Sequence, residues 1–360
     1  MFKNSDLTFN KRDRVLGLVL FSMALGLASL LPTQQAHSAE QEQSRNQQIG
    51  NFVPPRGWQP PPLNPKGVQL QTKKIGSGVY ALLSNKPPVD NSGFIVGRDG
   101  VLVIDSHING RMAQQIINAV RNVSDKPIIY LVNTNAHGDH TFGNHAFPES
   151  TLIVAHKHTA RDMRHFDKEK ALMLLAVGGD HSVLEDVQLR LPDIVFERSM
   201  TIDLGDRVVE LHHFGHGNTP GDTVVYEPVT KTAWTGNLVL GQQSIPWAIE
   251  GQAQSYLETL AKMAARLDIK TIIPGHVLTT TGAELENQLS YLSNHIQTIK
   301  SAIRSGKNLE QTLASYPLPE VFLPQKNSAL AAARPLMQGF HRWNVKKTYL
   351  ELKKQARVLK

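Results

Sequence analysis

The eight residues Asn133-Thr134-Asn135-Ala136-His137-Gly138-Asp139-His140 constrain this chain more than any other stretch. They follow an apolar run at residues 128–132, which is typical of a buried β-strand. Two imidazoles and one carboxylate therefore lie within four residues of one another just after a strand, where side chains can point toward a common site. Because imidazole and carboxylate are usual ligands of zinc, iron and manganese, the stretch predicts a divalent-metal site in preference to a polar surface loop.

This stretch resembles the His-x-His-x-Asp-His signature of the metallo-β-lactamase superfamily. It matches at His137, Asp139 and His140, while Asn135 replaces the first histidine. Further stretches resemble the other motifs of that family in the family's own order, at residues 101–105, 215–222, 235–237 and 272–276. The resemblance implies an α/β fold, the αββα metallo-β-lactamase sandwich, in which the metal ligands lie on loops along one edge of the two sheets.

The resemblance also implies a site for two metals, which three asparagines alter in this chain. The ligands of the family's first metal map onto Asn135, His137 and Asn218, and the aspartate that bridges the two metals maps onto Asn237. An amide oxygen is a neutral and weak donor to zinc compared with imidazole or carboxylate. We therefore expect the first metal site to be empty or very weak.

The ligands of the family's second metal map onto Asp139, His140 and His276, and all three are kept. Two imidazoles and one carboxylate are enough for one catalytic metal with an open coordination position. We expect one zinc ion, with iron or manganese as alternatives. His137 and His216 are possible further ligands, although a surface or hydrogen-bonding role is the simpler interpretation of His216.

The pattern favours a metal-dependent hydrolase in which water attacks a small ester, thioester or amide-type substrate. Water on a single zinc can have its pKa lowered to about 7, so one metal is chemically sufficient. Asp139 or His137 would then accept and donate the protons of the reaction. The residues expected to contact substrate or water, or to line the pocket, are Asn135, Asn218, Asn237 and Trp247.

Two other functions fit the same residues. A pseudoenzyme or binding protein that kept the fold and lost the hydrolytic centre would also carry asparagines at ligand positions. Two histidines with one carboxylate also occur in mononuclear iron sites, so a lyase or an iron oxygenase is a third hypothesis. The fold alone cannot choose among them, whereas metal content can: no metal indicates a binding protein, and redox-active iron indicates the third hypothesis.

Residues 1–39 have the features of a secretory signal. Four Lys or Arg residues precede a 17-residue apolar run, Val15–Leu31, and small residues follow at Ser38-Ala39. The run is long for a cleaved signal and short for a membrane span, so an uncleaved anchor is the alternative. We predict a periplasmic or secreted protein, with membrane association only if the signal is uncleaved.

Composition limits the partners. The chain has no cysteine, which excludes thiolate ligands and a cysteine nucleophile. Its formal net charge is +7, and removal of the signal takes away four basic and two acidic residues and leaves +5. No basic run with interleaved aromatic residues accompanies this mild charge, so we predict a small-molecule substrate and no nucleic-acid partner.

Four segments are predicted: a signal at 1–39, a Pro-rich linker at 40–67, a metallo-β-lactamase-like domain at 68–282 and a C-terminal helical region at 283–360. Apolar residues that recur every three or four positions predict helices at 109–122, 253–267 and 285–303. Gly306 is a natural stop for the last of these. The segment 156–176, which is rich in His, Lys, Arg and Met, is also predicted to be a helix. We expect the C-terminal region to pack on the sandwich, with a homodimer seam or a cover over the active-site mouth as alternatives.

Overall fold

The computed structural model describes residues 60–242, 244–328 and 330–358. The predicted signal and most of the predicted Pro-rich linker lie outside these residues. Within the described ranges, no helix is long and apolar enough to cross a membrane.

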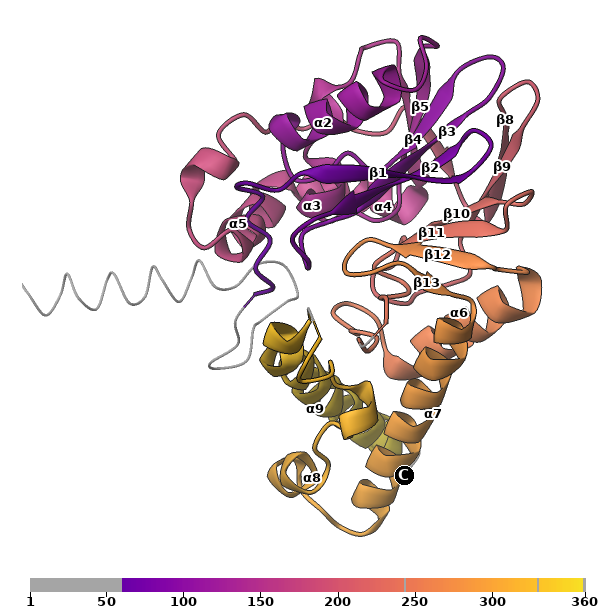
Figure 1. Cartoon of the computed structure of the whole chain (residues 1–360). Coiled ribbons are helices and arrows are strands. Elements are labelled where there is room, and N and C mark those ends of the chain that lie inside the picture. The colour runs from indigo at the N-terminus through magenta and orange to yellow at the C-terminus, as the bar shows by residue number, and fades with distance from the viewer. Residues whose placement is uncertain (1–59, 243, 329, 359–360) are drawn as a thin grey trace, which may run out of the picture. The chain divides into compact units, whose positions relative to one another are not determined.

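Two β-sheets form the centre of the molecule (Figure 1). The first has seven strands in sequential order: β1 (Leu70–Gly76), β2 (Val79–Ser84), β3 (Ser92–Val96), β4 (Val101–Ile104), β5 (Ile128–Asn133), β6 (Leu152–His156) and β7 (Ile194–Phe196). The second has six, in the order β13-β12-β11-β10-β9-β8: β8 (Ser199–Asp203), β9 (Val208–His212), β10 (Val224–Glu227), β11 (Thr232–Gly236), β12 (Thr271–Pro274) and β13 (Thr280–Thr281).

Strand direction places the loops that matter for function. The pairs β4–β5, β5–β6 and β11–β12 are parallel, while β1 to β4 and β8 to β11 are joined as antiparallel neighbours. Carboxyl ends of parallel neighbours meet at one edge of a sheet, so the loops after β4 and β5 lie together, as do those after β11 and β12. The inner faces of the two sheets share an apolar core, to which Leu102, Ile104, Leu211, Val225 and Trp234 contribute.

Helices cover the outer faces of both sheets (Figure 1). α2 (Gly110–Arg121) begins where the side chain of Asn109 accepts a hydrogen bond from the Met112 backbone, and its apolar face packs on the first sheet. α6 (Ala253–Arg266) and α7 (Ala283–Arg304) pack on the second sheet. The predicted αββα sandwich is therefore confirmed.

The single helix predicted at 156–176 is wrong. The segment forms α4 (Lys157–Asp162), a short 3-10 turn and α5 (Phe166–Ala176), because His165 leaves helical geometry at φ −86° and ψ 39°. The break lets Phe166 pack against Phe142, with 5.2 Å between ring centroids. It also turns α5 toward the loop after β5, where the Glu169 carboxylate accepts a hydrogen bond from the Gly138 N–H at 2.8 Å.

The C-terminal helical region that the sequence predicts is present. α7 ends before Gly306, which has a φ of 76°, and is followed by α8 (Leu309–Ser315) and α9 (Arg334–Val358). α9 packs back on the segment 246–249: the Trp247 and Phe340 rings stack with centroids 4.2 Å apart. The homodimer seam stays a prediction.

Candidate metal centre

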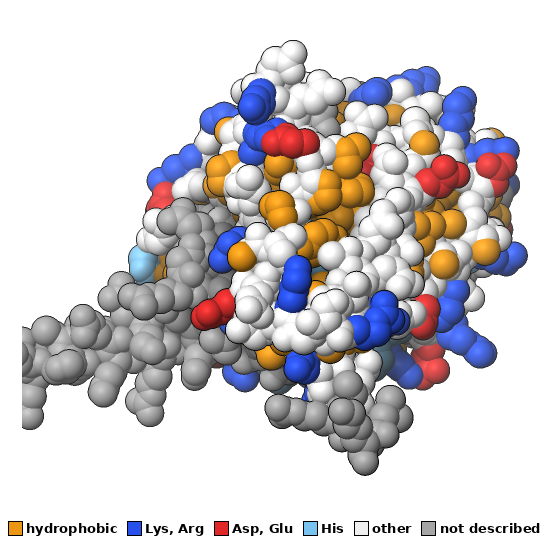
Figure 2. All heavy atoms as spheres, turned by 90° about the horizontal axis from the view of Figure 1, so that it is seen from below, with side chains coloured by type: hydrophobic (Ala, Val, Ile, Leu, Met, Phe, Trp, Pro, Cys, Tyr) orange, Lys and Arg blue, Asp and Glu red, His pale blue; other side chains and the backbone are white. Residues whose placement is uncertain are grey.

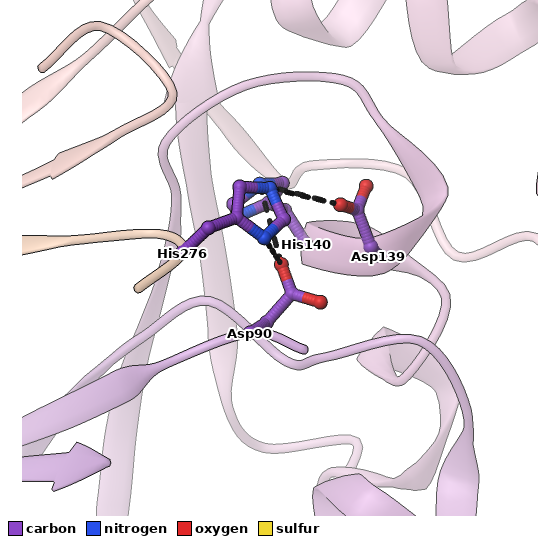
Figure 3. A group of neighbouring side chains, drawn as sticks. All are labelled: Asp90, Asp139, His140 and His276. Atoms are coloured by element: carbon purple, nitrogen blue, oxygen red, sulfur yellow. Dashed lines mark ion pairs between the residues drawn. The ribbon is translucent and has the colours of Figure 1, made fainter. Parts of the chain in front are cut away.

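Four side chains meet at the edge of the sandwich where the loops gather (Figure 3). Asp139 and His140 lie in α3 (Gly138–Thr141) just after β5, and His276 follows β12. Asp90 comes from the connection between β2 and β3. One ligand atom from each of the four lies within 4.8 Å of the others, and all but His276 are fully buried.

The spacing of these atoms suits one metal ion. His276 Nε2 lies 3.4 Å from Asp139 Oδ2, and His140 Nε2 lies 3.8 Å from that oxygen and 3.7 Å from Asp90 Oδ1. Tetrahedral ligands that are each about 2.0–2.2 Å from zinc are roughly 3.3–3.6 Å apart. Neither oxygen of Asp90, nor Asp139 Oδ1, has a hydrogen-bond partner among the described residues. Buried carboxylate oxygens without partners are costly, so the residues present fit a cation.

Hydrogen bonds behind the two imidazoles orient them. His140 Nδ1 lies 2.9 Å from Asp105 Oδ2, and His276 Nδ1 lies 2.7 Å from the Pro88 carbonyl oxygen. Both partners accept, so each Nδ1 carries the proton and each Nε2 is left as a ligand atom. Asp105 is held by two donors of Thr134, at 2.7 Å each. Its φ of 58° is unusual for a residue other than glycine, and these bonds maintain it.

The four groups have opposed pKa shifts. Burial, with Asp139 nearby, raises the pKa of Asp90 well above its usual range. Burial also acts to raise the pKa of Asp139, but His140 and His276 outweigh it and lower that pKa. Burial acts to lower the pKa of His140, yet Asp139 and Asp105 raise it to about 9, while burial lowers the pKa of His276 to about 4. A cluster that shares protons in this way is suited to exchanging them for a cation.

The asparagines at the predicted first-metal positions are all buried and each has a definite contact. Asn135 Oδ1 accepts a hydrogen bond from the His137 backbone at 2.9 Å, and Asn218 Nδ2 donates to the Trp247 carbonyl at 2.7 Å. Asn237 places Oδ1 3.2 Å from His140 Nε2 and Nδ2 3.2 Å from His137 Nδ1. Asn237 therefore lies between the two halves of the predicted site.

His137 and His216, the possible further ligands, lie outside the group of four. His137 is buried beside that group, with Nε2 3.9 Å from a Glu250 carboxylate oxygen. His216 is half-buried and lines a neighbouring groove of about 950 Å³, which also includes His137 and Glu250. Sequence reasoning missed Asp90, Glu169 and Glu250.

A cavity of about 70 Å³ opens on the cluster. Asp139, His276, Asn218, Asn237 and His137 lie on its polar side. Its other walls are apolar and come from distant parts of the chain: Leu63, Met173, Leu240, Trp247, Met337 and Phe340. Trp247 lines the cavity, and α9 closes the wall behind it; the role of Trp247 toward a substrate stays a prediction.

Comparisons with known proteins identify the family and agree with the fold. A model of the metallo-beta-lactamase superfamily matches residues 86–276. A metallo-beta-lactamase from Pontibacter korlensis has a TM-score of 0.51 and 20% identity, over 63% of this chain and 100% of that one. FIM-1 from Pseudomonas aeruginosa, in its mono-zinc form, has a TM-score of 0.51 and 19% identity, over 65% of this chain and 97% of that one. The sec-alkylsulfatase Pisa1 from Pseudomonas sp. has a TM-score of 0.57 and 14% identity, over 78% of this chain and 50% of that one. These structural similarities concern the fold.

Proposed function

Because the chain belongs to the metallo-β-lactamase superfamily, we propose that it is a hydrolase that depends on one metal ion and cleaves an ester, thioester or amide-type bond by attack of water. The observation that carries this proposal is the buried cluster in which Asp139, His140 and His276 direct ligand atoms at one point. A divalent ion bound there would supply Lewis acidity, which lets water act as a nucleophile near neutral pH. The mono-zinc form of FIM-1 supports a one-metal arrangement in this fold.

His137 is the side chain we assign to proton transfer. It lines both the cavity and the neighbouring groove, and its two ring nitrogens face Asn237 on one side and Glu250 on the other. A histidine in that position can pass a proton between the reacting group and the solvent-filled groove. Asn218 Oδ1 is buried without a hydrogen-bond partner and lines the same cavity, so we assign it to accept from substrate or water.

The cavity walls suggest which part of a substrate lies where. The apolar wall formed by Met173, Trp247 and Phe340 suits a compact apolar group next to the scissile bond, and it limits access of bulk water. The groove on the other side of His137 is lined by charged side chains of both signs, among them Lys168 and Glu250, which suit a polar portion. We further propose, from the N-terminal sequence, that the protein acts outside the cytoplasm on a small molecule.

Metal content and hydrolysis test the proposal together. We expect the purified protein to bind about one metal ion per chain and to hydrolyse at least one member of a panel of esters, thioesters and amides. His276→Ala should abolish both, because it removes one of only two imidazoles in the cluster. His181→Ala is the matched control, because that imidazole is exposed and outside the cluster. Metal-free protein as isolated, or activity that survives in His276→Ala, would refute the proposal.

A further inference from the structure

Asp90 is the member of the cluster that no sequence motif indicated, and its surroundings are unusual. It is 1% exposed, and within the described part of the chain neither carboxylate oxygen has a hydrogen-bond partner. Its Oδ1 lies 3.7 Å from His140 Nε2, the ligand nitrogen of that imidazole, and 3.4 Å from His276 Nδ1, the nitrogen that donates to Pro88 (Figure 3). A buried carboxylate without partners destabilises a fold unless a cation compensates it, so Asp90 points to a ligand and not to a structural role.

Hydrogen bonds of the next residue, Asn91, hold Asp90 in place by joining its segment to one more than 180 residues further along the chain. The Asn91 N–H donates to the Gly275 carbonyl at 2.6 Å, and Asn91 Nδ2 donates to the carbonyls of Pro274 and Val277 at 3.1 and 2.8 Å. Val277 has a φ of 57°, which is strained for a β-branched residue. The segment with Asp90 and the segment with His276 are thus clamped together, at the expense of local strain.

Holding Asp90 beside His140 places a negative charge where the family's bridging aspartate is replaced by a neutral asparagine. The family's bridging aspartate maps onto Asn237, whose neutral Oδ1 lies 3.2 Å from His140 Nε2. Asp90 presents a carboxylate to the same ring nitrogen from the β2–β3 connection, at 3.7 Å. With Asp139 it provides two negative charges, which neutralise one dication in a buried site, whereas Asp139 alone would leave a net positive charge there.

We propose that Asp90 is a direct metal ligand that replaces the charge lost at Asn237 and completes a site of two imidazoles and two carboxylates for one ion. The inference rests on the proposed function for the presence of a metal, but not for the reaction. It also gives the asparagines a role: they keep the space beside that ion free of a second cation.

The test compares Asp90→Asn with the natural full-length chain by two measurements, zinc affinity and the Tm of the metal-free protein. We expect the affinity to fall and the Tm to rise. Loss of partners behind a metal ligand typically weakens affinity 10–100-fold, so loss of a direct ligand should raise the zinc Kd by more than about 100-fold. The same change removes a buried, unpartnered carboxylate, so the Tm of the metal-free protein should rise by about 2–4 °C. A purely structural carboxylate would lower that Tm.

Asp186→Asn is the matched control, since Asp186 also has a buried oxygen without a partner but lies outside the cluster. It should leave the zinc Kd and the absorption spectrum of the cobalt-loaded protein unchanged. In Asp90→Asn, the cobalt spectrum should change because one ligand is lost.

A double variant makes the charge argument specific. Asn237→Asp, introduced into Asp90→Asn, returns a carboxylate to the other side of His140 and should recover at least about tenfold of the lost affinity. A zinc Kd in Asp90→Asn within about threefold of the natural value, with an unchanged cobalt spectrum, would overturn the proposal. These are binding measurements, so a protein that binds metal through Asp90 but hydrolyses nothing would refute the proposed function and leave this inference standing.

Discussion

Asn344 of α9 is the residue through which the C-terminal region should control the candidate site. It is 1% exposed; its Nδ2 donates to the Pro246 carbonyl at 2.7 Å and its Oδ1 accepts from the Ala248 N–H at 3.0 Å. Between these two contacts lies Trp247, whose carbonyl accepts from Asn218. The substitution Asn344→Ala therefore removes two of the hydrogen bonds that anchor this segment, while those from Trp343 and Lys347 remain.

The size of the effect follows from the groups left behind. Each buried donor or acceptor that loses its partner costs about 1–3 kcal/mol. Asn344→Ala takes this partner from the Ala248 N–H and the Pro246 carbonyl, and also removes the donor to the Tyr291 hydroxyl, which keeps its contact with His341. We expect the free energy of unfolding to fall by about 3 kcal/mol. We also expect KM for the best substrate of the panel to rise more than kcat falls, because the wall moves while the metal cluster is untouched.

Urea unfolding followed by circular dichroism and steady-state kinetics measure the two effects. Asn294→Ala is the matched control, since Asn294 is an exposed asparagine of α7 with one long contact to Ser290 at 3.5 Å. It should change stability by less than about 0.5 kcal/mol. A loss below about 1 kcal/mol in Asn344→Ala, or a KM equal to that of the control, would refute the reasoning.

Three further predictions follow from other parts of the molecule. Burial, with His341 nearby, lowers the pKa of His295 to about 3, so the unfolded chain binds more protons than the folded chain below pH 6.5. The free energy of unfolding should therefore fall by about 1.4 kcal/mol per pH unit as the pH decreases from 6.5. His295→Asn should reduce this slope, which urea unfolding at a series of pH values measures. A triple variant restores the family's ligands for the first metal and the bridging aspartate: Asn135→His, Asn218→His and Asn237→Asp. It should raise the metal content towards two ions per chain, measured by elemental analysis, and abolish the natural activity. Mass spectrometry of the exported protein should find an N-terminus near residues 37–41, whereas a chain that keeps Met1 and sediments with membranes would indicate an anchor.

The resemblance to the family predicts the sandwich and three of the four clustered side chains, whereas the apolar pattern alone fits several layered α/β arrangements. Asp139, His140 and His276 each follow a strand closely, and strand ends are readable from apolar runs. Their meeting is not readable in this way, because β5 and β12 belong to different sheets and only the packing of the two sheets brings their ends together.

Asp90 was not predictable in this way. It lies in the β2–β3 connection, and its position depends on hydrogen bonds of Asn91 to residues more than 180 positions away. The apolar wall shows the same limit, because the contact of Phe340 with Trp247 exists only once α9 has folded back. The break at His165 likewise has no glycine or proline to announce it.

The asparagines themselves argue for a site rebuilt for one ion over a decayed one. A centre that has lost its function is expected to keep no particular order among its former ligands, yet each amide here makes a contact that the family's ligand would not make in the same way. Asn218 holds the Trp247 segment through an N–H that a metal-bound imidazole would not direct there. Asn237 faces His137 Nδ1 with its Nδ2 at 3.2 Å, and only an amide can donate a hydrogen bond there, because a carboxylate has no N–H. With Asp90 supplying the missing negative charge nearby, these contacts favour the one-metal hydrolase over the pseudoenzyme.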